Sequence, residues 1–364
     1  MTSTIRMLTR YSRRASSSRL RHLMFEDRLR ADGHTLHHHA FFKDSHLERI
    51  YGEMTGGDGP AYRDYASCYA SRFRTIGSIG KSDILWVEKE IFPYLPARFD
   101  LFAMSRSRKC IIDIDDAWFL RYEDTVIAGP GSRRKFDKLL AAATVVTVPN
   151  SELENAVYKR GATDVRLIRP MVDTDMIHPR EVGDDSPTAT IGWIGTPPNA
   201  EEFLAPLTPV LNKLTETGRA KLLLIGARDA VPALRAERVE WTEETEASHL
   251  QRFDIGIMPL ADTPWNRCKS GFKLIQTMAA GAVPAGSAVG FNTNLIADGI
   301  NGVLVKAAPE IASMQKEWFH ALDKLIDDPK ILKRLALAAR KTAEERFSFE
   351  RRRDDVSELF ASLA

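Results

Sequence analysis

Short apolar runs of strand length alternate with helical patterns along the whole chain of 364 residues. Strands are predicted at residues 5–10, 34–42, 83–90, 109–115, 144–150, 165–170, 189–194, 221–225, 239–241, 254–259, 283–286 and 302–305. Helices are predicted between them at residues 17–31, 60–76, 132–142, 152–160, 200–215, 245–253 and 272–280. Strands that alternate with helices in this way form parallel sheets covered by helices on both faces. The chain is therefore predicted to be an α/β protein with two doubly wound, Rossmann-like domains.

A polar segment separates the two series of strands. Residues 173–188 include Pro179 and Pro187 and have no periodic apolar pattern, which is typical of a linker between domains. A chain of this length also exceeds the usual size of a single core. We therefore predict an N-terminal domain over residues 1–180, a C-terminal domain over 181–346 and a terminal helix over 347–364.

The composition is that of an ordinary globular protein, with 44% hydrophobic and 27% charged residues. No apolar run approaches the roughly 20 residues that span a bilayer, and the N-terminus has no apolar segment typical of a secretory signal. Cys68, Cys110 and Cys268 lie far apart without a CxxC pair, so neither a disulfide framework nor a zinc ribbon is expected. These features predict a cytoplasmic protein.

The formal net charge of +2 is unevenly divided along the chain. Residues 1–180 hold 29 lysines and arginines against 23 acids, a net +6, and the remaining residues hold 22 against 26, a net −4. The basic half either faces anionic lipid headgroups or an anionic acceptor, or forms a solvated arginine-rich helix face. The near-neutral total and the absence of a recognised motif predict no nucleic-acid partner.

Residues 269–305 carry the densest pattern of the chain. Lys269 and Lys273 lie four residues apart on either side of Gly271, where the helix over 272–280 is predicted to begin. The free N–H groups of a helix N-terminus, flanked by ammonium groups, form a binding site for a diphosphate. The pattern predicts a protein that holds a nucleoside diphosphate, attached to a sugar.

The same segment resembles the C-terminal signature of the glycosyltransferase family 4 group of retaining GT-B enzymes, the glycosyl transferases group 1. The matching positions are Gly271-Phe272, Lys273, Met278-Ala279-Ala280-Gly281, Pro284, Val289-Gly290, Asn292, Asp298-Gly299 and Asn301-Gly302. Residues 191–195 and 254–260 are similar to this group as well. The resemblance implies two Rossmann-like domains that face each other across a cleft, with a C-terminal helix that crosses back to the first domain. It also implies sugar transfer with retention from a nucleotide-diphospho-sugar.

The resemblance also assigns roles in donor binding. Lys273 and Lys269 are expected to act in catalysis by stabilising the negative charge that develops on the leaving diphosphate, without a metal ion or other cofactor. Four residues are expected to contact the phosphates, namely Gly195, Thr196, Gly271 and Phe272. Asn292 is expected to bind the sugar.

Gln276 occupies the position where this group often has the second acid of an E-x7-E pattern, and Cys268 occupies the first. A glutamine amide also forms hydrogen bonds to ribose hydroxyls, without a charge. Gln276 is therefore predicted to contact the ribose. Trp241 and Glu243, which follow a short strand, are predicted to flank the base, although a tryptophan at a strand end is more often part of a core.

The predicted acceptor site lies in the N-terminal half. The segment after the first strand supplies Ser17 and Arg19, and Asp115 and Asp116 end a strand and either contact the acceptor or hold a basic partner. Together with Asp113 these acids resemble a metal-binding DxD motif, but that motif belongs to a different transferase architecture. The run His37-His38-His39 also predicts no metal site, since successive residues of a strand point to opposite faces.

Three functions remain open. The first is transfer of a sugar to a hydroxyl of a glycan or lipid-linked acceptor, with possible peripheral association with the inner face of the membrane. The second is a GT-B nucleotide-sugar epimerase, which requires acid and base carboxylates around the sugar. The third is a non-catalytic nucleotide-sugar-binding protein, which the cysteine at position 268 makes conceivable.

Overall fold

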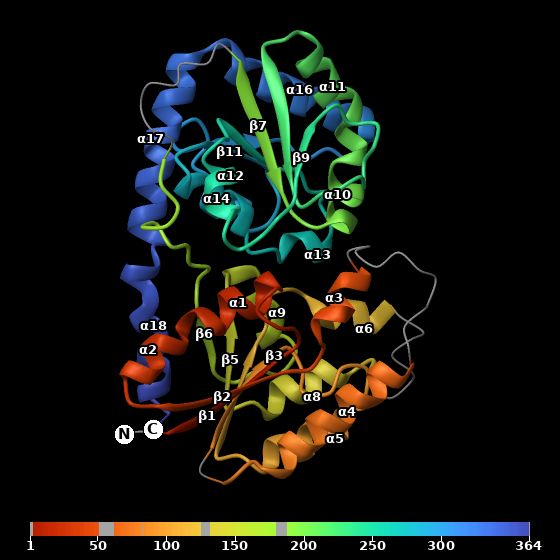
Figure 1. The fold of residues 1–364 in the computed structure, drawn as a ribbon, viewed down its shortest axis with the longest axis vertical. Coiled ribbons are helices and arrows are strands. Elements are labelled where there is room, and N and C mark those ends of the chain that lie inside the picture. Colours follow the sequence, from red (N-terminus) through yellow and green to blue (C-terminus); the bar gives the residue numbers. More distant parts are fainter. Residues whose placement is uncertain (1–2, 51–61, 82, 125–131, 180–187, 364) are drawn as a thin grey trace. The chain divides into compact units, whose positions relative to one another are not determined.

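The computed structural model describes residues 3–50, 62–81, 83–124, 132–179 and 188–363 (Figure 1). The chain divides into two compact units. Unit 1 comprises Met1–Pro170 together with Arg353–Ala364, and unit 2 comprises Met171–Arg352. Residues 180–187 of the predicted linker, and the predicted boundary at 180/181, lie outside the described residues.

Unit 1 is built on a sheet of six parallel strands in the order β2-β1-β3-β4-β5-β6. Its strands are β1 (Thr4–Thr9), β2 (Thr35–Ala40), β3 (Ile84–Glu88), β4 (Lys109–Asp113), β5 (Val145–Val148) and β6 (Val165–Leu167). The strand β3 is buried at every position, as expected of a central strand covered on both faces. Because β1 continues to β2 on one side and the chain then crosses to β3 on the other, the order of strands reverses between β1 and β3.

Helices cover both faces of this sheet (Figure 1). They are α1 (Ser16–Arg21), η1 (Leu23–Phe25), α2 (Glu26–Ala31), α3 (Asp44–Ile50), α4 (Tyr62–Gly77), α5 (Ala97–Ser105), α6 (Trp118–Asp124), α8 (Lys135–Ala142), α9 (Ser151–Tyr158) and α18 (Phe349–Ala361). Trp86 of β3 contacts Phe25 of η1 and Phe360 of α18, with ring centroids 6.1 Å and 5.3 Å away. On the other helix layer, Phe73 of α4 packs 4.5 Å from Phe92.

Unit 2 contains a second sheet of six parallel strands, in the order β12-β11-β10-β7-β8-β9. Its strands are β7 (Ala189–Ile194), β8 (Ala220–Ile225), β9 (Glu237–Val239), β10 (Ile255–Met258), β11 (Val283–Ser287) and β12 (Val303–Val305). The order reverses between β7 and β10. In sheets of this kind, ligands bind beyond the carboxyl ends of the strands at the point of reversal.

Two apolar clusters fill the two faces of the second sheet. The helices of unit 2 are α10 (Pro197–Phe203), η3 (Ala205–Leu207), α11 (Thr208–Glu216), α12 (Glu246–Leu250), α13 (Pro264–Arg267), α14 (Phe272–Ala279), α15 (Asn292–Leu295), α16 (Ile311–Asp327) and α17 (Pro329–Arg346). One cluster includes Leu274 and Met278 of α14, and the other includes Leu211 of α11 and Trp318 of α16, all four of which are buried. No helix among the described residues is long and apolar enough to cross a bilayer.

The α/β fold class and all twelve predicted strands are confirmed, with ends that shift by a few residues. The prediction of one continuous helix over 17–31 is wrong, since the helix breaks at His22 (φ −132°), whose ring packs 4.5 Å from Trp86. The single helix over 200–215 is wrong as well. Pro206 and Pro209 lie within that range and lack the N–H that a continuous helix requires, so α10, η3 and α11 follow one another instead.

Candidate donor and acceptor sites

The first loop of the candidate donor site follows β7. Gly195 donates its N–H to the carbonyl of Ile225 at 3.0 Å, which fixes the loop against the end of β8. Thr196 takes the N-cap position of α10, and its hydroxyl makes no capping bond. A Cβ atom on Gly195 would lie 2.6 Å from Nζ of Lys273 and 2.6 Å from the ring of Trp193. Only glycine therefore fits beneath this lysine.

Lys273 extends from the first turn of α14 to the loop after β7. Its Nζ atom lies 4.1 Å from the ring centroid of Trp193, a buried side chain that forms the floor of this site. Burial and the nearby charge of Lys269 lower the pKa of Lys273 to about 7, and Glu202 opposes that shift. Lys273 forms no ion pair with any described residue. The site thus holds a lysine that makes no close ion pair with a described carboxylate, although Glu202 acts on it from further away.

The N-terminus of α14 faces the same region. Gly271 is its N-cap residue, with a left-handed φ of +68°, and the half-buried Phe272 follows. No side chain of a described residue caps this helix end, so an anion is a suitable partner for its first N–H groups. Nζ of Lys269 lies 5.7 Å from the ring centroids of Phe203 and Trp265. The predicted start of this helix, between the two lysines, is confirmed.

Gln276, one turn further along α14, is 3% exposed and donates from Nε2 to Oε1 of Glu246 at 3.0 Å. The other carboxylate oxygen of Glu246 accepts a 2.5 Å hydrogen bond from the indole Nε1 of Trp241. The structure thus brings the predicted Trp241 and Gln276 together through an acid that the sequence analysis missed. A signal was present, because Glu246 begins a helix five residues after Trp241. Glu243, which lies between Trp241 and Glu246 in the sequence, is half-buried.

Asn292 is 1% exposed and donates from Nδ2 to the carbonyl of Ser287 at 3.1 Å. Its Oδ1 atom is buried without a hydrogen-bond partner among the described residues, close to Gly271. The Asn301-Gly302 pair that follows Asn292 in the matching segment has a structural role. Asn301 accepts from the N–H of Ala297 at 2.8 Å and so closes the turn before β12.

The predicted acceptor residues of unit 1 lie at the carboxyl end of its sheet. Ser17 is half-buried on α1, while Arg19 on the same helix is 4% exposed. Asp115 follows β4 and lies 3.0 Å from Nζ of Lys89, which is the basic partner that the sequence left as one alternative. Burial raises the pKa of Asp115 to about 6, and Lys89 opposes the shift. The neighbouring Asp116 is half-buried.

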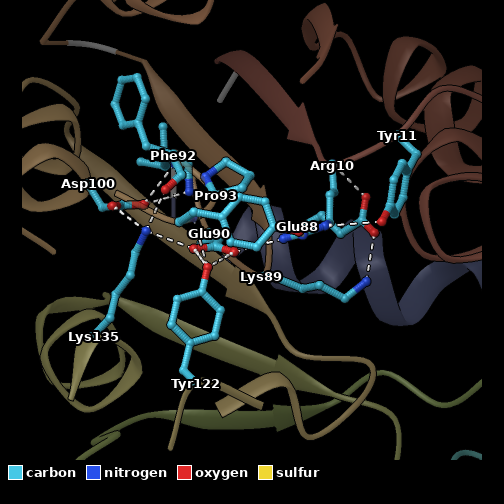
Figure 2. Close-up of polar contacts among 12 residues, drawn as sticks. Arg10, Tyr11, Glu88, Lys89, Glu90, Phe92, Pro93, Asp100, Tyr122 and Lys135 are labelled. Carbon is cyan, nitrogen blue, oxygen red and sulfur yellow. Dashed lines mark hydrogen bonds and ion pairs between the residues drawn. The ribbon is translucent and has the colours of Figure 1, made fainter. Parts of the chain in front are cut away.

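Unit 1 also contains a network of buried ion pairs that includes Arg10, Glu90 and Lys135 (Figure 2). Arg10 pairs with Glu90 at 2.8 Å, and Lys135 bridges Glu90 at 2.7 Å and Asp100 at 2.9 Å. Lys89 pairs with Glu88 at 2.9 Å, so its two carboxylate neighbours raise its pKa even though burial acts to lower it. Arg10, Lys89 and Lys135 belong to this network although none of them was predicted as a site residue from the sequence.

Among the described residues, no group of three or more histidine, cysteine or acidic side chains is placed to hold a metal ion. The three consecutive histidines lie on β2, where His38 bonds Thr9 at 2.8 Å and His39 bonds Ser71 at 3.0 Å. The side chains of His38 and His39 therefore form hydrogen bonds with different elements, the first with β1 and the second with α4.

Comparison with known proteins agrees with this architecture. Residues 188–328 match the family model described as glycosyl transferases group 1. The chain is similar to a sucrose-phosphate synthase of Thermosynechococcus elongatus, with a TM-score of 0.70 and 12% identity over 99% of each chain. It is also similar to HepE of Anabaena in complex with UDP and glucose, with a TM-score of 0.68 and 13% identity over 98% of this chain and 99% of that one.

A glycosyltransferase of Rickettsia africae has a TM-score of 0.61 and 13% identity over 99% of this chain and 98% of that one. No curated protein matches the chain by sequence. Identities this low establish a shared fold, and the family model establishes the class of the domain in unit 2. The chain has the GT-B fold of these solved glycosyltransferases, and residues 188–328 of its unit 2 match the glycosyl transferases group 1 model.

Proposed function

We propose that this protein transfers a sugar from a nucleotide-diphospho-sugar to a hydroxyl of a glycan or lipid-linked acceptor, with retention and without a metal ion. The single observation that supports this most is the position of Lys273. Its ammonium group lies against Gly195 and Trp193, beside the N-terminus of α14, and forms no close ion pair with a described carboxylate. An anionic group is the ligand that compensates such a cation.

The chemistry follows from the charge that the reaction develops. When the bond between the sugar and the diphosphate breaks, negative charge grows on the leaving phosphate oxygen. Lys273, Lys269 and the first N–H groups of α14 provide positive charge at that place, and cations held in advance stabilise the transition state more than the ground state. Backbone contacts from Gly195, Thr196, Gly271 and Phe272 complete the proposed phosphate site. This arrangement supplies the positive charge that a divalent ion provides in other transferases.

The proposed ribose and base site lies one turn along α14. Glu246 accepts from both Gln276 and Trp241, so its carboxylate is fixed where ribose hydroxyls can donate to it. Glu243 is proposed to lie near the base. Asn292, whose Oδ1 atom lies next to Gly271, is proposed to contact the sugar, either directly or by holding the loop before α15.

The acceptor is proposed to bind unit 1 near Ser17, Arg19, Asp115 and Asp116. Asp115 supports this proposal because its pKa of about 6 allows its carboxylate to accept the proton or hydrogen bond of an attacking hydroxyl. A location at the inner face of the membrane is proposed only for the case of a lipid-linked acceptor.

A thermal-shift screen tests the donor site. UDP is the first nucleotide to test, because HepE of Anabaena was solved with UDP and glucose. We expect one class of nucleotide sugar among the UDP, GDP and ADP series to stabilise the wild type, and the shift to disappear largely in Lys273→Ala. Lys213→Ala is the matched control, since Lys213 also lies over an aromatic ring of unit 2, 4.5 Å from the centroid of Phe319. Equal loss in both variants would contradict the assignment of Lys273.

Product analysis separates the alternatives. Incubation with the stabilising donor is expected to yield a glycosylated acceptor whose anomeric configuration, determined by NMR, matches that of the donor. The reaction is expected to proceed in excess EDTA. A free epimerised sugar would instead indicate an epimerase, and nucleotide binding without transfer or donor hydrolysis across an acceptor panel would indicate a non-catalytic binding protein.

A further inference from the structure

The order of strands in unit 1 reverses between β1 and β3, which marks the place beyond the strand ends where ligands bind in open α/β sheets. The residues at that place come from three loops. Arg10 and Tyr11 directly follow β1, Tyr94 follows β3 and Trp118 begins α6 after β4. Figure 2 shows Arg10 and Tyr11 beside the end of β3.

Four aromatic rings surround the guanidinium of Arg10. Its Cζ atom lies 4.4 Å from the ring centroid of Trp118, 5.3 Å from Tyr94, 5.5 Å from Phe42 and 5.7 Å from Tyr11. Arg10 also donates to the hydroxyl of Tyr94 at 2.9 Å. The rings cover the arginine side chain, which is only 1% exposed. Its contacts with them in turn hold the rings in place.

The outer rings remain accessible while the inner ones are buried. Tyr94 is 36% exposed and Tyr11 and Trp118 are half-buried, whereas Phe42 is 2% exposed. Tyr94 also has a φ of +65°, a conformation that is strained for a bulky side chain. The loop after β3 is held in this conformation partly by the hydrogen bond from the N–H of Tyr94 to the hydroxyl of Tyr122 at 2.9 Å. Strain of this kind is concentrated at binding sites.

Apart from Arg121, an exposed arginine of α6 that lies 5.1 Å from the ring centroid of Trp118, three buried cations of this region are already compensated. Arg10 pairs with Glu90, Lys89 pairs with Glu88 and Asp115, and Lys135 pairs with Glu90 and Asp100. A phosphate placed among these buried groups would meet four carboxylates and three cations. The buried part of the region therefore places polar groups around the aromatic rings but carries no excess positive charge.

We infer that the acceptor presents a neutral pyranose ring to this region, and that the ring packs on Tyr94 and Trp118 with its hydroxyls directed to Asp115. This inference rests on the proposed function and narrows its acceptor from any glycan or lipid phosphate to a carbohydrate recognised by its own ring. A sugar ring has an apolar face of C–H groups and a rim of hydroxyls, so it matches aromatic rings bordered by a carboxylate. A prenyl chain would find polar groups around it, and its phosphate would find no unpaired cation among the three buried ones just described.

The test uses the full chain and a panel of methyl pyranosides as probes. Their binding is measured by saturation-transfer NMR in the presence of the stabilising nucleotide. At least one pyranoside is expected to bind the wild type, and Trp118→Leu and Tyr94→Leu are each expected to weaken it about fivefold or more. Trp118→Phe, which keeps a ring, is expected to retain most of the affinity. Tyr158→Leu is the control, because Tyr158 is an exposed aromatic residue on α9 of the same unit, 46% exposed.

Two results would overturn the inference. One is unchanged pyranoside binding in both ring-deleted variants. The other is binding of vesicles that contain a prenyl phosphate by a protein that binds no pyranoside. Nucleotide binding, followed by thermal shift in the same samples, reports on the proposed function separately, so that its failure is distinguishable from failure of the sugar site. The two leucine variants lie on different loops, and the melting temperature of each shows that it is folded.

Discussion

The side-chain amide of Gln276 donates to the carboxylate of Glu246 at 3.0 Å, and the indole of Trp241 donates to the other oxygen of the same carboxylate. A glutamine at position 276 thus fits its surroundings, because its amide can donate to the carboxylate of Glu246. An acid at position 276 would place two carboxylates within hydrogen-bond distance, and like charges so close cannot both remain ionised without cost.

We therefore expect Gln276→Glu to lower the free energy of unfolding by about 1–2 kcal/mol at pH 8, since a hydrogen bond is replaced by repulsion. The loss is expected to be smaller at pH 5, since repulsion between two adjacent carboxylates favours protonation of one of them as the pH falls. Urea denaturation at the two pH values measures this difference.

The exchanged pair Glu246→Gln with Gln276→Glu is the control for that experiment. It restores one donor and one acceptor, with the carbonyl of the new glutamine available to Trp241, and should recover most of the stability. A double variant as unstable as Gln276→Glu would show that the pair does not interact as the structure places it.

Affinity for the nucleotide sugar is expected to depend on pH through Lys273. Its pKa of about 7 means that the ammonium form, which is the form proposed to bind the diphosphate, becomes the minor form above neutral pH. The dissociation constant should rise about tenfold per pH unit above pH 7, until the pH reaches the pKa of the lysine in the complex. Isothermal titration with the stabilising nucleotide sugar between pH 6 and pH 9 measures this slope.

Lys273→Arg is the informative comparison, because a guanidinium does not titrate in this range. Its affinity should be nearly constant from pH 7 to pH 9, whereas Lys213→Ala should follow the wild type. A wild-type affinity that does not change over this range would contradict the assignment of the lysine to the phosphate site.

Gly195→Ala is expected to weaken nucleotide binding about tenfold or more. The added methyl group would lie 2.6 Å from both Nζ of Lys273 and the buried ring of Trp193, so the lysine must leave its position. Gly77→Ala is a matched control, since a Cβ atom there would meet no heavy atom within 4 Å. Retained affinity in Gly195→Ala would show that the ligand does not need Lys273 at this place.

Lys135→Met is expected to destabilise the protein by about 3–5 kcal/mol at pH 8, because Glu90 and Asp100 lose the cation that both carboxylates share. Burial already raises the pKa of Asp100 to about 6, against the opposing charge of Lys135. Since the folded pKa lies above the ordinary value of 3.8, this acid lowers stability as the pH rises from about 4 to 6.

Without Lys135, Asp100 should bind its proton more tightly still, so the loss of stability should be smaller at pH 5 than at pH 8. Lys138→Met, an exposed lysine of the same helix, should change stability by less than about 0.5 kcal/mol. A Lys135→Met variant as stable as this control at pH 8 would contradict the buried network.

Helix ends could be predicted from the sequence where glycine marks them, but not where a distant contact sets them. The helix over 272–279 was predicted almost to the residue, since glycine precedes it and Gly281 ends it with a φ of +69°. The break at His22 could not be foreseen, because no proline or glycine lies there. The backbone turns at this residue where the imidazole packs against Trp86, which is 64 positions away in the chain.

The sequence by itself determined the twelve strands, their parallel arrangement and the lysine-bearing helix, because these features depend on local apolar runs and on residues a few positions apart. Only the tertiary structure decided that Glu246 joins Trp241 to Gln276, and that Arg10 pairs with Glu90 80 positions away inside a cage of aromatic rings. Such pairs depend on which strands are neighbours and in which register. The order of strands in a sheet is set by the packing of the whole unit, and short-range patterns do not contain it.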